Sequence, residues 1–185
     1  MKNLIRAATI FVLAAFSASL AFAEDPSDAW VKGLWLKAVG LPDGAGPEDM
    51  SQDDNEPYFI YSFGESGDGP AVTIAVGRYP QNELAEKILK LDKKALAEFD
   101  GAENFLETAK DLKFTEAPAK ISDKLTYPCQ MAAYTNADMG LSHTVLFIQT
   151  DPYLFSVSVN RLTKDKKYGE ADVEKWLMDL ELVEQ

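Results

Sequence analysis

Two residues that could form a nucleophilic site are each unique in this sequence: Cys129 and His143. An imidazole beside a thiol can activate it as a nucleophile, so we consider a Cys/His-dependent enzyme as one alternative. Strand alternation, however, groups Cys129 with Met131 and Ala133, an apolar set. We therefore interpret the cysteine as a buried thiol and the histidine as a partly buried strand residue. A disulfide to a second chain remains open for Cys129, because a single cysteine excludes only an intramolecular one.

The other motifs typical of enzymes are missing. The chain contains no Gly-x-Ser-x-Gly elbow, no His-Glu-x-x-His zinc motif and no Ser-x-x-Lys motif with its companions. The glycines of Gly64-x-x-Gly67-x-Gly69 lie between two predicted strands, whereas a phosphate cradle precedes a helix. We therefore expect a protein that is not an enzyme, with no catalytic residues and no cofactor.

Leu41–Pro57 is a polar loop that holds the densest group of oxygen ligands in the chain. Calcium takes six to eight oxygen ligands, and acidic loops can supply them. The spacing does not match a calcium-binding helix–loop–helix motif, so we interpret the segment as a solvated loop and keep calcium binding as an alternative. The carboxylates that this alternative would use are Asp49, Asp53, Asp54 and Glu56, with Glu48 beside them.

The first 23 residues have the pattern of a secretory signal peptide. Lys2 and Arg6 precede an uncharged apolar run, and Ala21-Phe22-Ala23 is a small-x-small cleavage site. The run is shorter than the roughly 20 residues that a membrane-spanning helix needs. We therefore expect a periplasmic or secreted protein without a stable membrane anchor after cleavage, and a retained N-terminal anchor is the alternative.

Charge restricts the partners of the exported chain. Without Lys2 and Arg6, the 18 basic residues fall to 16 against 30 acidic residues, which gives a net charge of −14. Such a surface repels nucleic acid and anionic membranes. We expect an N-terminal helix and acidic loop over residues 24–57, followed by one domain over residues 58–185.

The segment Leu141–Arg161 gives the clearest structural prediction, an antiparallel hairpin around Asp151-Pro152. If Thr150 pairs with Tyr153, one face of the hairpin is apolar, since it carries the pairs Ile148–Phe155, Leu146–Val157 and Thr144–Val159. The other face is half polar and could bind a partner or ligand. Its candidate binding residues are His143, Val145, Phe147, Ser156, Ser158 and Asn160.

Periodicity predicts the remaining elements. We expect strands at Tyr58–Gly64, Ala71–Tyr79 and Cys129–Asn136, and helices at Ser27–Gly40, Asn82–Phe99, Glu103–Leu112 and Glu170–Val183, with a connection at Pro118–Asp123. Sequential strands with tight turns indicate an antiparallel sheet of about five strands in an α+β fold of order α-ββ-αα-βββ-α. Helices on both faces would make it an α/β/α sandwich.

The strand Cys129–Asn136, the hairpin Ser142–Arg161 and the closing helix with Trp176 together resemble the PsbP/Mog1-like α/β/α sandwich proteins. The resemblance is one of element order and implies a non-catalytic accessory domain that binds a partner. Our first expectation is therefore an exported, non-enzymatic accessory protein with a protein partner in the bacterial envelope. A periplasmic protein that binds a small ligand or calcium is the second.

Overall fold

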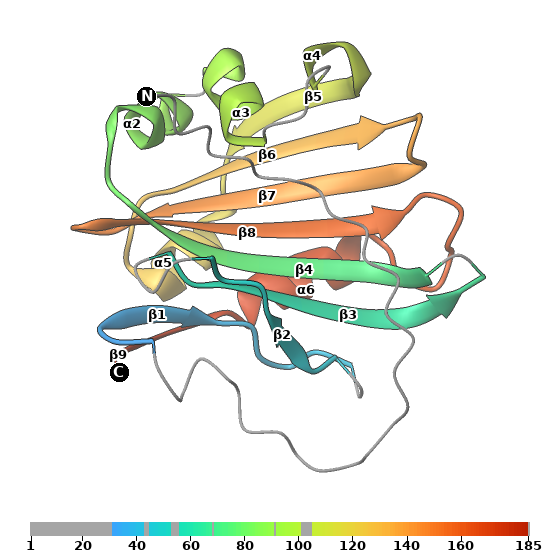
Figure 1. Ribbon diagram of the computed structural model, residues 1–185, viewed down its shortest axis with the longest axis horizontal. Coiled ribbons are helices and arrows are strands. Elements are labelled where there is room, and N and C mark those ends of the chain that lie inside the picture. The colour runs from blue at the N-terminus through green and yellow to red at the C-terminus, as the bar shows by residue number, and fades with distance from the viewer. Residues whose placement is uncertain are drawn as a thin grey trace.

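The computed structural model describes residues 31–42, 45–52, 56–67, 69–90, 92–100 and 105–184. Most of its strands form one antiparallel sheet in the order β2-β3-β4-β8-β7-β6-β5, as Figure 1 shows. The strands are β2 (Pro47–Asp49), β3 (Tyr58–Ser66), β4 (Gly69–Pro80), β5 (Ala109–Glu116), β6 (Cys129–Asn136), β7 (Leu141–Gln149) and β8 (Tyr153–Leu162). The α+β class with an antiparallel sheet is as predicted, although the sheet has more strands than expected.

The hairpin β7–β8 lies at the centre of the sheet, and its register is the predicted one. Ile148 pairs with Phe155, and His143 pairs with Asn160. Side-chain alternation in the hairpin then determines which residues of the neighbouring strands share each face, because β4 pairs with β8 and β6 pairs with β7. The predicted strand Cys129–Asn136 is confirmed as β6, and the two earlier predicted strands are confirmed within β3 and β4.

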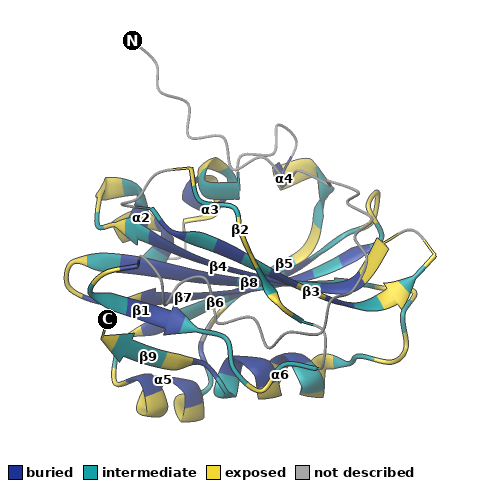
Figure 2. Ribbon diagram, turned by 60° about the horizontal axis from the view of Figure 1, so that its bottom comes forward, coloured by how far each residue is buried: buried dark blue, intermediate teal, exposed yellow. Residues whose placement is uncertain are grey.

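One face of the sheet packs against two helices and a small second sheet. The helices are α5 (Ala119–Leu125) and α6 (Glu170–Met178), and the second sheet pairs β1 (Leu34–Lys37) with β9 (Glu181–Glu184). Figure 2 shows all four on the same side of the large sheet. Trp35 is fully buried there, in edge-to-face contact with Phe59 of β3 and Phe155 of β8. This face holds the larger hydrophobic core.

Three short helices lie on the opposite face: α2 (Glu83–Leu89), α3 (Lys93–Asp100) and α4 (Phe105–Thr108) (Figure 2). Asn82 caps α2, since its side-chain oxygen accepts a hydrogen bond from the Ala85 N–H at 2.9 Å. Ile88 and Leu96 pack with Phe147 and Leu154 of the central hairpin in a second core.

The helix predicted over Ser27–Gly40 is wrong, because Leu34–Lys37 is strand β1. The helical spacing of Trp30, Leu34 and Ala38 is the pattern that misled the prediction. Trp35 and Leu36 are both buried although they are neighbours in the chain. Neighbouring residues of a strand point to opposite faces, so a ribbon covered on both faces explains this burial.

The long helix predicted over Asn82–Phe99 is two helices, α2 and α3. Asp92 begins the second, because its carboxylate accepts a hydrogen bond from the Lys94 N–H at 2.8 Å. The helix predicted over Glu103–Leu112 ends at Thr108, and the chain continues as edge strand β5.

Two further predictions at the ends of elements are wrong. The segment predicted as a connection over Pro118–Asp123 contains α5. The closing helix ends at Met178, and its predicted last turn is strand β9. Its predicted stripe of Val173, Trp176 and Leu177 is buried as expected.

The predicted signal peptide at residues 1–23 lies outside the described residues. Within the described ranges, no helix combines the length and the apolar character needed to cross a membrane. Two strands of the predicted N-terminal segment pair with the rest of the chain, since β1 pairs with β9 and β2 pairs with β3.

Candidate functional site

The half-polar face predicted as a binding surface is largely covered. Phe147, Val145, Ser156 and His143 are buried, and α2, α3 and α4 pack over the first two through the second hydrophobic core. The remaining two predicted residues, Ser158 and Asn160, are half-buried. The structure therefore brings all six residues together on one sheet face, where the helices cover Val145 and Phe147.

His143 is the centre of a polar cluster on this face. Its ring stacks on Tyr134 with 4.6 Å between centroids and 9° between planes. Its Nδ1 lies 2.6 Å from Asn160 Oδ1, which also accepts a hydrogen bond from the Ser158 hydroxyl at 3.2 Å. An amide oxygen only accepts, so this arrangement assigns the proton of neutral His143 to Nδ1. Nε2 is then an acceptor, and it is buried without a hydrogen-bond partner among the residues that the structure describes.

Burial controls the charge of the cluster. It lowers the pKa of His143, and the Asn160 hydrogen bond and the Asp100 carboxylate offset only part of that effect. The Tyr134 hydroxyl donates a hydrogen bond to Asp100 at 3.0 Å, and burial together with this carboxylate raises the pKa of Tyr134. The cluster is therefore neutral at its histidine near pH 7, with one carboxylate above it at the end of α3.

The Cys129–His143 pair considered from the sequence is ruled out by the sheet. Cys129 pairs with Ile148 at one end of β6, whereas His143 pairs with Tyr134 near the other end. Cys129 belongs to the core under α5 and α6, and His143 stacks on a residue of the opposite core. The thiol is buried, as predicted, and its sulfur contacts the Tyr127 carbonyl at 3.3 Å.

The acidic loop is described only in part. Asp49 lies in β2, where one of its carboxylate oxygens accepts a hydrogen bond from the Ser51 N–H at 2.9 Å. Asp53 and Asp54 lie outside the described residues, and Glu56 is half-buried. Among the described residues, no three His, Cys, Asp or Glu side chains come together as a metal site.

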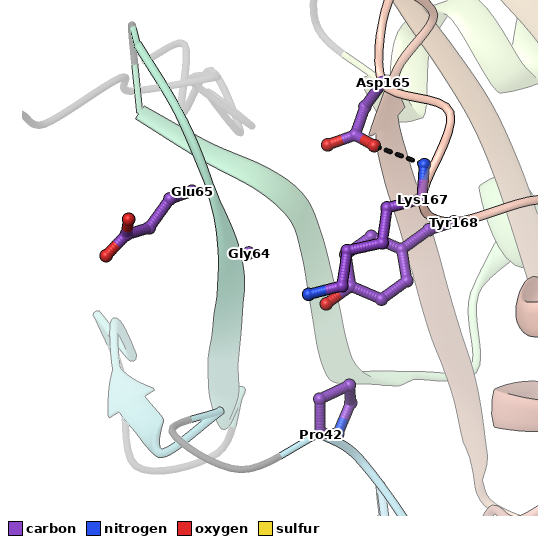
Figure 3. Close-up of a pocket in the computed structure, with 6 residues that line it drawn as sticks. All are labelled: Pro42, Gly64, Glu65, Asp165, Lys167 and Tyr168. Carbon is purple, nitrogen blue, oxygen red and sulfur yellow. Dashed lines mark hydrogen bonds between the residues drawn. The ribbon is translucent and has the colours of Figure 1, made fainter.

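A polar pocket of about 510 Å³ lies between the end of β3 and the turn that connects β8 to α6. Figure 3 shows the Lys167 side chain extended beside the Tyr168 ring, with Pro42 below them and Gly64 on the facing strand. The Lys167 ammonium lies 4.9 Å from the centroid of the Tyr168 ring. Sequence analysis found no site here, because its residues come from three separate segments.

Two hydrogen bonds hold the turn of this pocket. Arg161 donates to the Tyr168 carbonyl at 2.7 Å, and the Lys167 N–H donates to the Asp165 carboxylate at 2.7 Å. Tyr168 packs edge-to-face on Phe63 at 5.5 Å, so its ring rests on the core. The pocket therefore has one fixed wall, which offers an ammonium group and a hydroxyl.

A groove of about 390 Å³ runs beside strand β9. The apolar residues that line it are Leu34, Leu125, Tyr127, Leu180 and Leu182, and the polar ones are Lys124, Thr126 and Glu181. The Lys124 ammonium is fixed at one side, because it donates to the Met178 carbonyl at 2.6 Å. The sequence held no local signal of this groove, since β9 was predicted as the end of a helix.

No model of a known protein family matches the chain, and no curated protein matches it either. The resemblance to PsbP/Mog1-like proteins thus stays a prediction from element order.

Proposed function

We propose that the protein is an exported, non-enzymatic accessory protein that binds a protein partner in the bacterial envelope. The observation that carries the proposal is the groove beside β9, which is lined by both apolar and polar residues. This composition is typical of the centre and rim of a protein–protein interface. The signal-peptide pattern of residues 1–23 supports the location.

Affinity capture tests this proposal. The mature chain is immobilised and exposed to the envelope fraction of its own cells, in parallel with two variants. Leu182→Ser removes an apolar side chain from the groove floor. Leu106→Ser is the matched control, because Leu106 is exposed on α4, across the large sheet from the groove.

We expect a defined protein to be retained by the wild type and by Leu106→Ser, and to be lost from Leu182→Ser. Retention by all three chains would place the interface elsewhere. Recovery of no specific protein from any of them would overturn the proposed function.

The polar pocket of Figure 3 favours a second candidate, binding of a small polar ligand. Its volume of about 510 Å³ lies in the range common to small-molecule sites. A thermal-shift screen of small metabolites and of calcium tests this candidate, because a ligand that binds only the folded state raises the melting temperature. A response that Lys167→Ala abolishes would support the pocket, whereas a response to calcium that this variant keeps would point to the acidic loop.

A further inference from the structure

The second sheet of the molecule has two different edges. Leu34 of β1 directs its carbonyl away from β9, because the guanidinium of Arg78 donates to it at 2.9 Å. The same guanidinium donates to the Lys32 carbonyl at 2.8 Å. Arg78 is buried and therefore closes the outer edge of β1 against the large sheet.

This arrangement determines the direction of every backbone group in the ribbon. Along an antiparallel strand, residues alternate between those that bond to the partner strand and those that point outward. Since Leu34 points outward, so does Leu36, which lies directly opposite Leu182. Two residues directly opposite each other in an antiparallel pair either bond to each other or both point outward. The N–H and C=O of Leu182 therefore point away from β1. The N–H and C=O of Val183 point toward Trp35.

Among the described residues, no backbone hydrogen bond outside the helices and strands involves Leu182, and β9 has no strand on its other side. Leu182 also lines the groove, together with Leu34 of β1 and with Leu125, Tyr127 and Leu180. The groove therefore lies beside an edge strand, and most of the residues that line it are apolar. Proteins that capture extended peptides use these two features, since the edge supplies hydrogen bonds and the floor accepts alternate side chains.

We propose that this groove binds an extended segment of the partner, which adds to β9 as a third strand of the β1–β9 sheet. The inference rests on the proposed partner-binding function and specifies the form of the partner. The segment carries small apolar side chains at alternate positions, to fit the leucine-lined floor. It also carries basic residues near its ends, because the exposed Glu181 and Glu184 lie at the two ends of β9 in a strongly acidic protein.

A synthetic peptide tests this mode of binding directly. The probe is a capped hexapeptide of alternating valine and threonine with one added lysine at each end. Its matched control has the same sequence with N-methyl groups on alternate backbone nitrogens, which remove the donors on one edge. Binding is followed by NMR titration of the ¹⁵N-labelled mature protein.

We expect the probe to shift the amide signals of Leu182 and Glu184 and to protect them from hydrogen exchange. The N-methylated peptide should bind at least about tenfold more weakly, because about one hydrogen bond or more is lost. Leu182→Pro should weaken probe binding similarly, since it removes the outward donor of the protein. Equal binding of both peptides, or no binding of the probe, would overturn strand addition.

The capture experiment separates this inference from the function on which it rests. A partner retained by the wild type and equally by Leu182→Pro would preserve the partner-binding function and exclude strand addition. A partner retained by the wild type and lost from Leu182→Pro would support both. If the Pro variant does not fold, the N-methylated peptide still decides with the wild-type protein.

Discussion

The position of His143 in the sheet could be predicted from the sequence, but its contacts with other elements could not. Its strand, its face and its neighbour Asn160 follow from the alternation of the hairpin. The stack on Tyr134 and the carboxylate of Asp100 do not, because they depend on where β6 and α3 are placed. The histidine is buried in its neutral form, and its protonation should therefore oppose folding.

The pH dependence of stability should reveal this burial. Burial holds the pKa of His143 in the folded state below its ordinary value, so the unfolded chain binds a proton more readily. The stability due to neutral His143 is complete above about pH 6.5 and is lost as the pH falls through the folded pKa. His143→Phe keeps a ring beside Tyr134 but does not titrate.

We therefore expect the wild type to lose melting temperature relative to His143→Phe as the pH falls from about 7.5 to 5. Thermal melting of both proteins in the same buffers measures this difference. A constant difference over that range would show that His143 does not change its charge relative to the unfolded chain.

Gly64 should be intolerant of a side chain for two separate reasons. Its φ is +72°, and a Cβ atom there would lie 2.9 Å from the Tyr168 ring. We expect Gly64→Ala to lower the free energy of unfolding by about 1–3 kcal/mol. Gly67→Ala in the turn after β3 is the control, because a Cβ at Gly67 would have no contact within 4 Å among the described residues. Denaturant unfolding of the two variants would contradict the argument if both lost the same stability.

At the scale of elements, neighbouring residues of β9 differ in the direction of their backbone N–H groups. Leu182 directs its N–H outward, and Val183 directs its N–H to Trp35. Both variants remove an apolar side chain that packs on the core, but we expect Leu182→Pro to lower the free energy of unfolding less than Val183→Pro, since proline is tolerated where the strand N–H points outward. Val183→Pro should cost about 2–3 kcal/mol, because it removes a hydrogen bond of the ladder.

Denaturant unfolding of these two variants tests the alternation independently of any partner. The reverse order, with Leu182→Pro the less stable protein, would mean that the outward edge of β9 has been assigned to the wrong residues. The strand-addition proposal would then have to move to Val183.

The elements that could be predicted from the sequence are those whose partners are close along the chain. The β7–β8 hairpin was predicted to the exact register, because period-two alternation and a tight turn are local signals. Strands β1 and β9 were predicted as helix, because each is four residues long and pairs with a strand at the far end of the described chain. The candidate groove depends on both of them, so it could not be predicted either.

At the scale of the whole molecule, the same two strands join distant parts of the chain into one core. Trp35 of β1 contacts Phe155 in the central hairpin, and Leu180 before β9 belongs to the same hydrophobic cluster. Val183 pairs with Trp35, so β9 holds that tryptophan in place. The stability of the sheet should therefore depend on a strand that lies outside it.

Removal of residues 181–185 tests this dependence. Loss of β9 takes away the only strand paired with β1 among the described residues and uncovers part of Leu36, which is fully buried. We expect the free energy of unfolding to fall by about 3 kcal/mol or more, with a single transition at a lower temperature. Glu181→Ala is the control, because Glu181 is exposed and its change leaves the ladder intact. A truncated protein that melts at the wild-type temperature would show that β1 stays in place without β9 and that the ribbon contributes little to the core.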